Sequence, residues 1–163
     1  MGGMEQHLPS ERDGEWMRRA LAEADRAGET GEVPIGAVVV RDGEVLAAAG
    51  NRRIVDADPT AHAEMLAIRA AAEAIGDWRL TGCTLAVTLE PCCMCAGAIV
   101  LARLDRLVYG AADPKGGGVR TLYRICDDAR LNHAVEVVPG VLAESCARRL
   151  TEFFRAQRAM GKK

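Results

Sequence analysis

The 163-residue sequence predicts an α/β fold in three layers, in which a mixed five-stranded sheet is covered by helices on both faces. Two observations predict it. Short apolar runs suited to strands alternate with longer segments whose apolar residues recur at helical spacing. A strong two-residue hairpin signal, Asp42-Gly43, joins the first two strands. The length and the 49% hydrophobic content fit one domain over residues 1–163, with a flexible N-terminus at 1–13.

The first half of the chain is expected to form a helix, a hairpin and a second helix. The first helix keeps its apolar side chains on one face, and Gly28 follows its end. A polar loop at 51–60 ends in Asp58-Pro59-Thr60, which is typical of a helix start. The expected elements are a helix at 15–27, strands at 35–40 and 44–49, and an Ala-rich helix at 61–75.

The second half alternates strands with helices. Pro91 suits the first turn of a helix, and the stretch DPKGGG at 113–118 is typical of a loop. Residues 121–128 leave a short helix and a loop both open. The expected elements are strands at 83–89, 106–110 and 134–138, and helices from Pro91 to about 102 and at 144–159.

Six cysteines could form three disulfides, but the N-terminus has no export pattern and no apolar run could span a bilayer. A cytoplasmic, reducing compartment with free thiols is therefore expected. Cys83, Cys126 and Cys146 lie among apolar residues and are interpreted as small core residues.

Charge is unevenly distributed along the chain. The whole sequence carries −2, whereas residues 144–163 hold six basic and two acidic residues, a net +4. This basic C-terminal helix could be a solvated surface or a phosphate-contacting tail. Phe154, Arg155 and Arg158 are the candidates for contact with RNA.

Two short segments carry the chemistry. His62-Ala63-Glu64 opens one expected helix, and Pro91-Cys92-Cys93-Met94-Cys95 opens another. The two-residue gap lets one helical turn aim the sulfurs of Cys92 and Cys95 at one point, at the positive end of the helix dipole. His62 can supply a third ligand. Three protein ligands leave one zinc position for water, which is typical of a catalytic site with one Zn²⁺ per subunit.

Glu64 is the expected catalytic acid and base. Two thiolates and a neutral imidazole cancel the charge of Zn²⁺, so such a metal acidifies water less than an all-histidine site would. A nearby carboxylate is then needed to take the proton. Glu64 lies on the same first turn as His62 and can reach that water without binding the metal.

Other interpretations of the two segments are a redox-active Cys-x-x-Cys and a structural zinc site. The first leaves the His-Ala-Glu segment unused. The second needs a fourth protein ligand, for which His7, His133 and Cys93 are available without any paired spacing. The two segments together therefore favour catalysis.

H-x-E followed by P-C-x-x-C is the signature of zinc nucleobase deaminases. The runs GEVPIGAVVV, PTAHAEM, VTLEPCCMCAGAIV and LNHAVEVVPGVLAESCARRLTEFFRAQR resemble the bacterial tRNA adenosine deaminases of the TadA type. The resemblance covers residues 16–158. It implies a cytidine-deaminase-like fold and conversion of adenosine to inosine at the wobble position of a tRNA anticodon, with the base splayed out of its loop.

The resemblance also implies roles for particular residues. His62, Cys92 and Cys95 match the metal ligands, and Glu64 matches the proton shuttle. Asn51 matches the asparagine that hydrogen-bonds the base, and Pro34 and Ile35 match the base-pocket wall. The implied partners are a tRNA anticodon stem-loop and a second copy of the chain in a homodimer, with no membrane.

The segment at 116–128 departs from the family pattern, because Arg120 and Arg124 add charge where many relatives carry small residues followed by Ser-Leu-Met. Two other functions remain open. A deaminase of free guanine would use the same metal chemistry without needing the basic terminal helix. A non-catalytic zinc module that binds RNA would have no use for Glu64.

Overall fold

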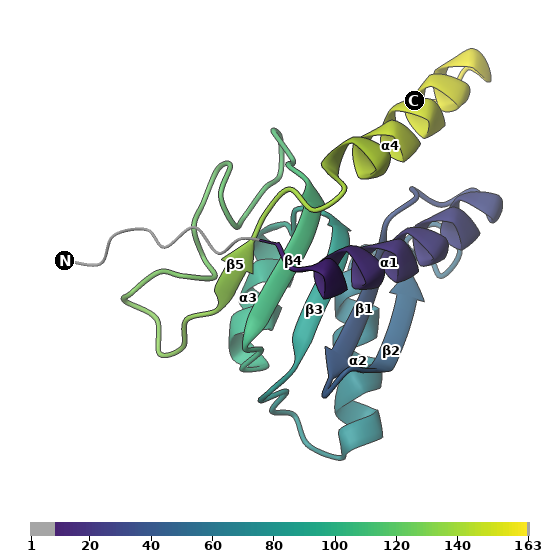
Figure 1. Cartoon of the computed structure of the whole chain (residues 1–163). Helices are drawn as coiled ribbons and strands as arrows, with labels where there is room; N and C mark the ends of the chain where they lie inside the picture. The colour runs from purple at the N-terminus through teal and green to yellow at the C-terminus, as the bar shows by residue number, and fades with distance from the viewer. Residues whose placement is uncertain (1–8, 163) are drawn as a thin grey trace.

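The structure is a computed structural model that describes residues 9–162. It contains a five-stranded mixed sheet in the order β2-β1-β3-β4-β5 (Figure 1). β1 pairs antiparallel with β2 and β3, and β4 pairs parallel with β3 and β5. This confirms the expected mixed sheet. The strands are β1 (Gly36–Arg41), β2 (Glu44–Gly50), β3 (Thr84–Leu89), β4 (Arg106–Ala111) and β5 (Glu136–Val138).

Helices cover both faces of this sheet. α1 (Glu11–Glu29) crosses one face, α2 (Ala63–Ile75) and α3 (Cys93–Leu101) cover the other, and α4 (Ala143–Ala159) extends beyond the body (Figure 1). Successive side chains of each strand point to opposite faces of the sheet, so the protein has one hydrophobic core on each face. Val38 of β1 packs in the cluster with α1, whereas its neighbour Val39 packs in the cluster with α2 and α3.

The first helix begins four residues earlier than the sequence predicts. Ser10 is its N-cap: its side chain accepts from the Asp13 amide at 3.3 Å, and the Asp13 carboxylate accepts from the Ser10 amide at 2.9 Å. This reciprocal capping box stabilises a first turn that sequence periodicity did not require. Residues 11–13, expected to belong to the flexible N-terminus, are therefore helical, while residues 1–8 of that expectation lie outside the described residues.

Residues 121–128, for which a short helix and a loop were both open, form turns and irregular backbone. In α4 the apolar side chains are only partly covered: Cys146 is buried, Phe153 is half-buried, and Phe154 is 45% exposed. The outer half of α4 leaves the sheet behind and has little to pack against (Figure 1).

The three cysteines expected in the core are there. Cys83, Cys126 and Cys146 are buried free thiols, and burial raises the pKa of Cys126 to about 12 and that of Cys146 to about 11. Such thiols are inert packing groups. Within residues 9–162, no helix combines the length and apolar character needed to cross a membrane.

Candidate active site and metal site

The candidate site lies at one edge of the sheet, where several chain segments meet. The carboxyl ends of β2, β3 and β4 and the start of β1 share this edge, as the pairing of Gly36 with Gly50 and of Leu89 with Ala111 shows. α2 and α3 both begin here. The residues that follow the strands and open the helices are therefore brought together, although they are far apart in sequence.

His62, Cys92 and Cys95 come together as a potential metal-binding group. Their ligand atoms all lie within 4.8 Å of one another. His62 Nδ1 is 3.6 Å from Cys92 Sγ and 3.5 Å from Cys95 Sγ. His62 and Cys92 are the N-cap residues of α2 and α3, and neither side chain is used for capping. Both are consequently available to a ligand.

These distances fit a tetrahedral ion. With zinc–sulfur bonds of about 2.3 Å and zinc–nitrogen bonds of about 2.0 Å, a tetrahedral angle separates sulfur from nitrogen by about 3.5 Å. The donor set also fits, because two thiols and an imidazole suit a borderline-soft cation. The group is thus positioned to bind a metal ion with three protein ligands.

The two thiols lie close enough together to form a hydrogen bond. The hydrogen bond from Cys95 lowers the pKa of Cys92 to about 3, and His62 supports the same thiolate. That hydrogen bond, together with burial, raises the pKa of Cys95. A divalent cation is the partner that would allow both sulfurs to ionise.

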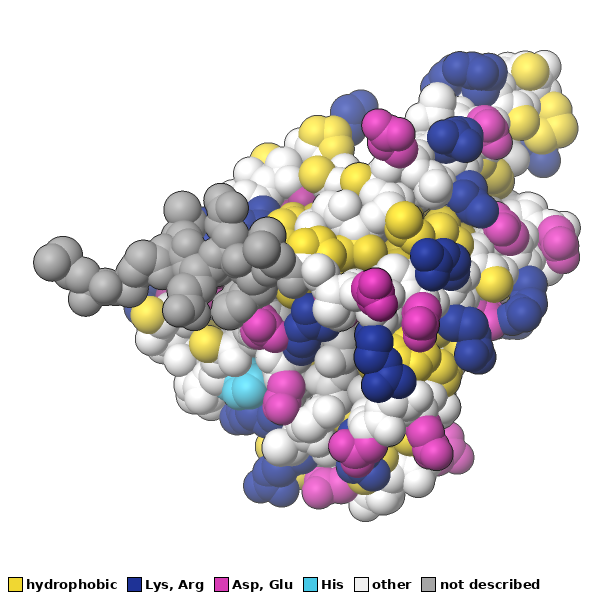
Figure 2. All heavy atoms as spheres, in the orientation of Figure 1, with side chains coloured by type: hydrophobic (Ala, Val, Ile, Leu, Met, Phe, Trp, Pro, Cys, Tyr) yellow, Lys and Arg dark blue, Asp and Glu magenta, His cyan; other side chains and the backbone are white. Residues whose placement is uncertain are grey.

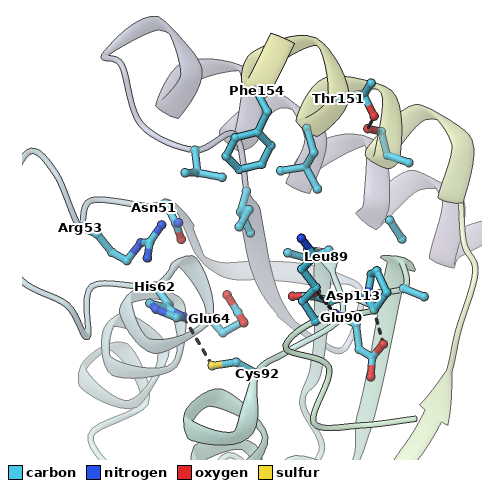
Figure 3. A pocket seen from close by; sticks show the side chains of 18 of the residues that line it. Asn51, Arg53, His62, Glu64, Leu89, Glu90, Cys92, Asp113, Thr151 and Phe154 are labelled. Atoms are coloured by element: carbon cyan, nitrogen blue, oxygen red, sulfur yellow. Dashed lines mark hydrogen bonds between the residues drawn. The ribbon is translucent and has the colours of Figure 1, made fainter. Parts of the chain in front are cut away.

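Glu64 lies on the first turn of α2 and is only 4% exposed. Burial raises its pKa above the ordinary value for a glutamate. The carboxyl lies beside the potential metal-binding group and faces the same cavity (Figure 3). A buried carboxyl with a raised pKa can hold a proton and release it again, which suits general acid–base chemistry.

The other residues considered as a fourth metal ligand do not join this group in the described part of the chain. His133 Nε2 is 2.7 Å from the Leu104 carbonyl oxygen, and Cys93 is exposed. Neither belongs to the potential metal-binding group, and His7 lies outside the described residues. Among residues 9–162, no fourth protein ligand therefore joins the three, and a position is left for water.

Asn51 and Ile35 line the cavity, which has a volume of about 780 Å³. Asn51 is 3% exposed, and its Oδ1 accepts from the Ala63 amide at 2.9 Å. Pro34 is buried and does not line the cavity, so the expectation of a wall role for Pro34 is not met. Val33 lines the cavity instead, because Pro34 turns its ring toward Gly28 of α1.

α4 forms the roof of this cavity. Phe154 and Arg158 line it, but Arg155 does not. The reason is helical spacing: Phe154 and Arg158 are four residues apart on one face, whereas Arg155 points about 100° away. Figure 3 shows Phe154 above the cavity, with His62, Glu64 and Cys92 at its base.

The sequence did not single out the side walls of the cavity. Arg53 follows Asn51 on one side, and Glu90, Asp113 and Lys115 lie on the other (Figure 3). Glu90 could have been suspected, since a carboxylate directly after an apolar strand and before Pro91 is unusual. Arg120 and Arg124, in the segment that departs from the family pattern, do not line the cavity and instead pair with Asp127 at 3.1 and 3.0 Å.

Comparison with known proteins identifies first the class of enzyme and then the particular family. A family model described as MafB19-like deaminase matches residues 11–158, so the fold and site are those of a deaminase. The "tRNA-specific adenosine deaminase" of Bacillus subtilis is 54% identical over 143 residues, which cover 88% of this chain and 89% of that protein. The chain belongs to the family of tRNA-specific adenosine deaminases.

Solved structures agree with this family. A structure from a study of A-to-I editing by tRNA:A34 deaminases at the wobble position is 51% identical, with a TM-score of 0.80, and covers 83% of this chain and 99% of its own. The guanine deaminase of Bacillus subtilis is 29% identical with a TM-score of 0.61, covering 93% of this chain and 95% of its own. The shared fold thus carries more than one deaminase specificity.

Proposed function

We propose that this protein hydrolyses adenosine to inosine at the wobble position of a tRNA anticodon. One observation carries the proposal. A potential metal-binding group and a buried carboxyl share the base of a cavity that opens toward the cationic side chains of Arg53, Lys115 and Arg158. The family to which the chain belongs acts on adenosine in tRNA, and these cations suit a phosphate backbone.

His62, Cys92 and Cys95 would hold one Zn²⁺, which supplies a Lewis acid that makes water a better nucleophile. Glu64 takes a proton from the water that attacks C6 of adenine and delivers it to N1. A second proton transfer through Glu64 allows the amino group to leave as ammonia. Burial of Glu64 keeps this proton exchange within the cavity.

Asn51 orients the base. Its Oδ1 is occupied by the Ala63 amide, so its carboxamide nitrogen remains to donate to an acceptor on the purine. Phe154 offers an aromatic face above the cavity, and a base splayed out of a single-stranded loop gains from such stacking.

A homodimer and a cytoplasmic location complete the proposal. Several large apolar side chains are exposed, among them Trp78 at 54%, Leu101 at 67% and Tyr123 at 58%, and a second copy could cover them. The six cysteines are free, which suits a reducing compartment. Sedimentation equilibrium would report the oligomeric state, and a monomer at all concentrations would contradict the dimer.

The test compares substrates. Zinc-loaded protein is incubated with an anticodon stem-loop RNA that carries adenosine at the wobble position and, separately, with guanine, guanosine and adenosine. Mass spectrometry of the nucleosides measures the products. We expect inosine in the stem-loop at a far higher kcat/KM than any product from the small molecules. A preference for guanine with no inosine in RNA would replace the tRNA substrate with a free base.

A further inference from the structure

Glu90 is a buried carboxylate that the proposed reaction does not use. It follows the last residue of β3 and is 2% exposed. Its Oε2 accepts from the amides of Val119, Arg120 and Thr121 at 3.2, 2.9 and 3.0 Å. Its Oε1 accepts from the Asp113 amide at 3.1 Å and from the Thr121 hydroxyl at 2.5 Å.

The charge of this carboxylate is balanced by peptide dipoles. The groups described as donating to its oxygens are four backbone amides and the Thr121 hydroxyl. Four amides converging on one carboxylate form a concave anion site of the kind that binds phosphate elsewhere. Here the anion belongs to the protein itself.

The loop that supplies these amides is called the anchored loop (residues 113–121), and it fits tightly. A Cβ added to Gly117 would lie 2.4 Å from Glu90 Oε2, and one added to Gly118 would lie 2.9 Å from the backbone of Cys92. The Gly118 amide also donates to the Pro91 carbonyl at 2.8 Å. Glycine is needed at both positions, because Gly117 lies against the Glu90 carboxylate and Gly118 lies against the backbone of Cys92 and Cys93.

The anchored loop reaches the cavity at its other end. Asp113, Pro114 and Lys115 line the cavity. Asp113 lies on the side opposite Asn51 and Arg53 (Figure 3). Asp113 Oδ1 accepts from the amides of Lys115 and Gly116, both at 3.0 Å, which fixes the shape of this end. One carboxylate therefore connects a wall of the cavity to the turn that carries Cys92.

We propose that Glu90 is a positioning residue for deamination: its two carboxyl oxygens accept the hydrogen bonds that hold the anchored loop, so that Asp113 and Lys115 form a wall of the nucleotide cavity. The inference rests on the proposed function and extends it to substrate binding. Glu90 acts through the loop and does not touch the reacting atoms. Loss of one of these acceptor oxygens releases the loop and weakens substrate binding more than it slows the chemical step.

Glu90→Gln tests this with little change in shape. Its NH₂ group would face amide donors, so one side of the network loses its acceptor. We expect faster hydrogen exchange at the amides of Asp113 and Val119 to Thr121, with wild-type exchange in β1 and β3. If the ordered loop falls to about a tenth of molecules, the KM for the stem-loop rises about tenfold. We expect kcat and zinc content to change less than twofold.

Two further variants keep the test decisive if Glu90→Gln fails to fold. Thr121→Val is the milder one because it removes a single donor to Glu90, and Gly117→Ala is the harsher one because its Cβ would lie 2.4 Å from Glu90 Oε2. Both should show the same pattern, with Thr121→Val the weaker. Gly14→Ala is the matched control, because a Cβ there meets only the Arg18 guanidinium at an ordinary 3.7 Å.

Wild-type exchange in the anchored loop of Glu90→Gln, or an unchanged KM, would overturn the proposal. Zinc loss with exchange raised throughout the chain in Thr121→Val as well as in Glu90→Gln would also overturn it, since Glu90 would then serve the fold alone. If even the wild-type protein leaves the stem-loop unmodified, the proposed function fails by itself. Stem-loop affinity, measured by fluorescence anisotropy, then replaces KM: about tenfold weaker binding by Glu90→Gln supports the proposal, and equal binding overturns it.

Discussion

Asn51 and Ala63 are joined by a buried hydrogen bond of 2.9 Å, in which the Ala63 amide donates to Asn51 Oδ1. This bond ties the residue after β2 to the first residue of α2. Asn51 thereby satisfies an orphan amide at a helix start, and its side chain also lines the cavity. We therefore expect this side chain to serve both stability and the proposed contact with the base.

Asn51→Ala should affect both properties, whereas Asn51→Asp should separate them. The alanine variant leaves the Ala63 amide unpaired, which costs about 1–3 kcal/mol of stability. Aspartate still offers that amide an acceptor at the positive end of the helix dipole, but it cannot donate to the base. We expect the melting temperature of Asn51→Asp to lie closer to that of the wild type than the melting temperature of Asn51→Ala does. Both variants should lose most of their turnover. Equal melting temperatures for the two variants would contradict this separation.

The potential metal-binding group gives a second prediction. Cys92→Ser or Cys95→Ser should lose metal and activity together, because a serine hydroxyl is a poor ligand for Zn²⁺. Metal analysis after dialysis should find about one zinc per wild-type chain and far less in either variant. Cys93→Ser is the matched control, since Cys93 is exposed and lies outside the group. Full zinc occupancy in both Cys92→Ser and Cys95→Ser would refute the ligand assignment.

Glu64→Gln should retain zinc and the fold but lose nearly all turnover. General acid–base groups contribute about 10²- to 10⁴-fold, and Glu64 is proposed to act in more than one step. Because Glu64 is buried and uncharged glutamine has nearly the same shape, stability should not fall. Single-turnover rates on the stem-loop provide the measurement. Rates within tenfold of the wild type would remove Glu64 from the mechanism.

The sequence predicted the sheet, the order of elements and the potential metal-binding residues, because each depends on short-range patterns. His62 and Cys92 could be identified from spacing, because their motifs are short and each lies at the start of a single helix. The contacts of Glu90 could not be identified in this way, because its partners at 113 and 119–121 come close to it only when β3 and β4 pair. The resemblance implied a wall role for Pro34 and Ile35, but matched motifs do not show which side chains face a cavity, and in the structure Val33 and Ile35 line it.

Asp13 and Arg106 provide a prediction about stability and pH. Arg106 Nη2 donates to Asp13 Oδ2 at 2.7 Å, and Asp13 is 1% exposed. Burial raises the pKa of Asp13, but hydrogen bonds from Arg106 and Ser10 outweigh it, and the pKa falls below its usual range. A lowered native-state pKa contributes stability that is present above the unfolded value of about 3.9 and lost as pH falls through the native value.

Asp13→Asn should therefore destabilise the protein at neutral pH, by roughly 3 kcal/mol, since it leaves the partly buried Arg106 without one of its partners. The difference from the wild type should begin to shrink as pH falls below about 4, because the Asp13 carboxyl of the unfolded chain takes up a proton there, and it should vanish only below the lowered native pKa. Urea unfolding at pH 7 and at acidic pH measures it. A difference that stays constant with pH would show that the charge of Asp13 contributes nothing.

Arg158 and Arg155 offer a matched pair for the role of the basic terminal helix. Both are exposed, neither side chain has a hydrogen bond or ion pair among residues 9–162, and they lie three positions apart on α4. Figure 2 shows Lys and Arg side chains gathered on this projecting helix. Only Arg158 lines the cavity. Arg155→Ala and Arg158→Ala change net charge and helix propensity equally. Any difference in their binding to the stem-loop therefore comes from where each side chain lies on the helix.

We expect Arg158→Ala to weaken stem-loop binding more than Arg155→Ala and to reduce the slope of log affinity against log salt by about one. A phosphate beside the cavity would lie within reach of Arg158, whereas Arg155 points away and contributes only long-range attraction that salt screens. Zinc content and melting temperature should stay at wild-type values in both variants. Binding measured between 50 and 200 mM salt, a range suited to counterion release, gives the comparison. Equal, small losses in the two variants would mean that α4 carries these arginines only as a solvated surface.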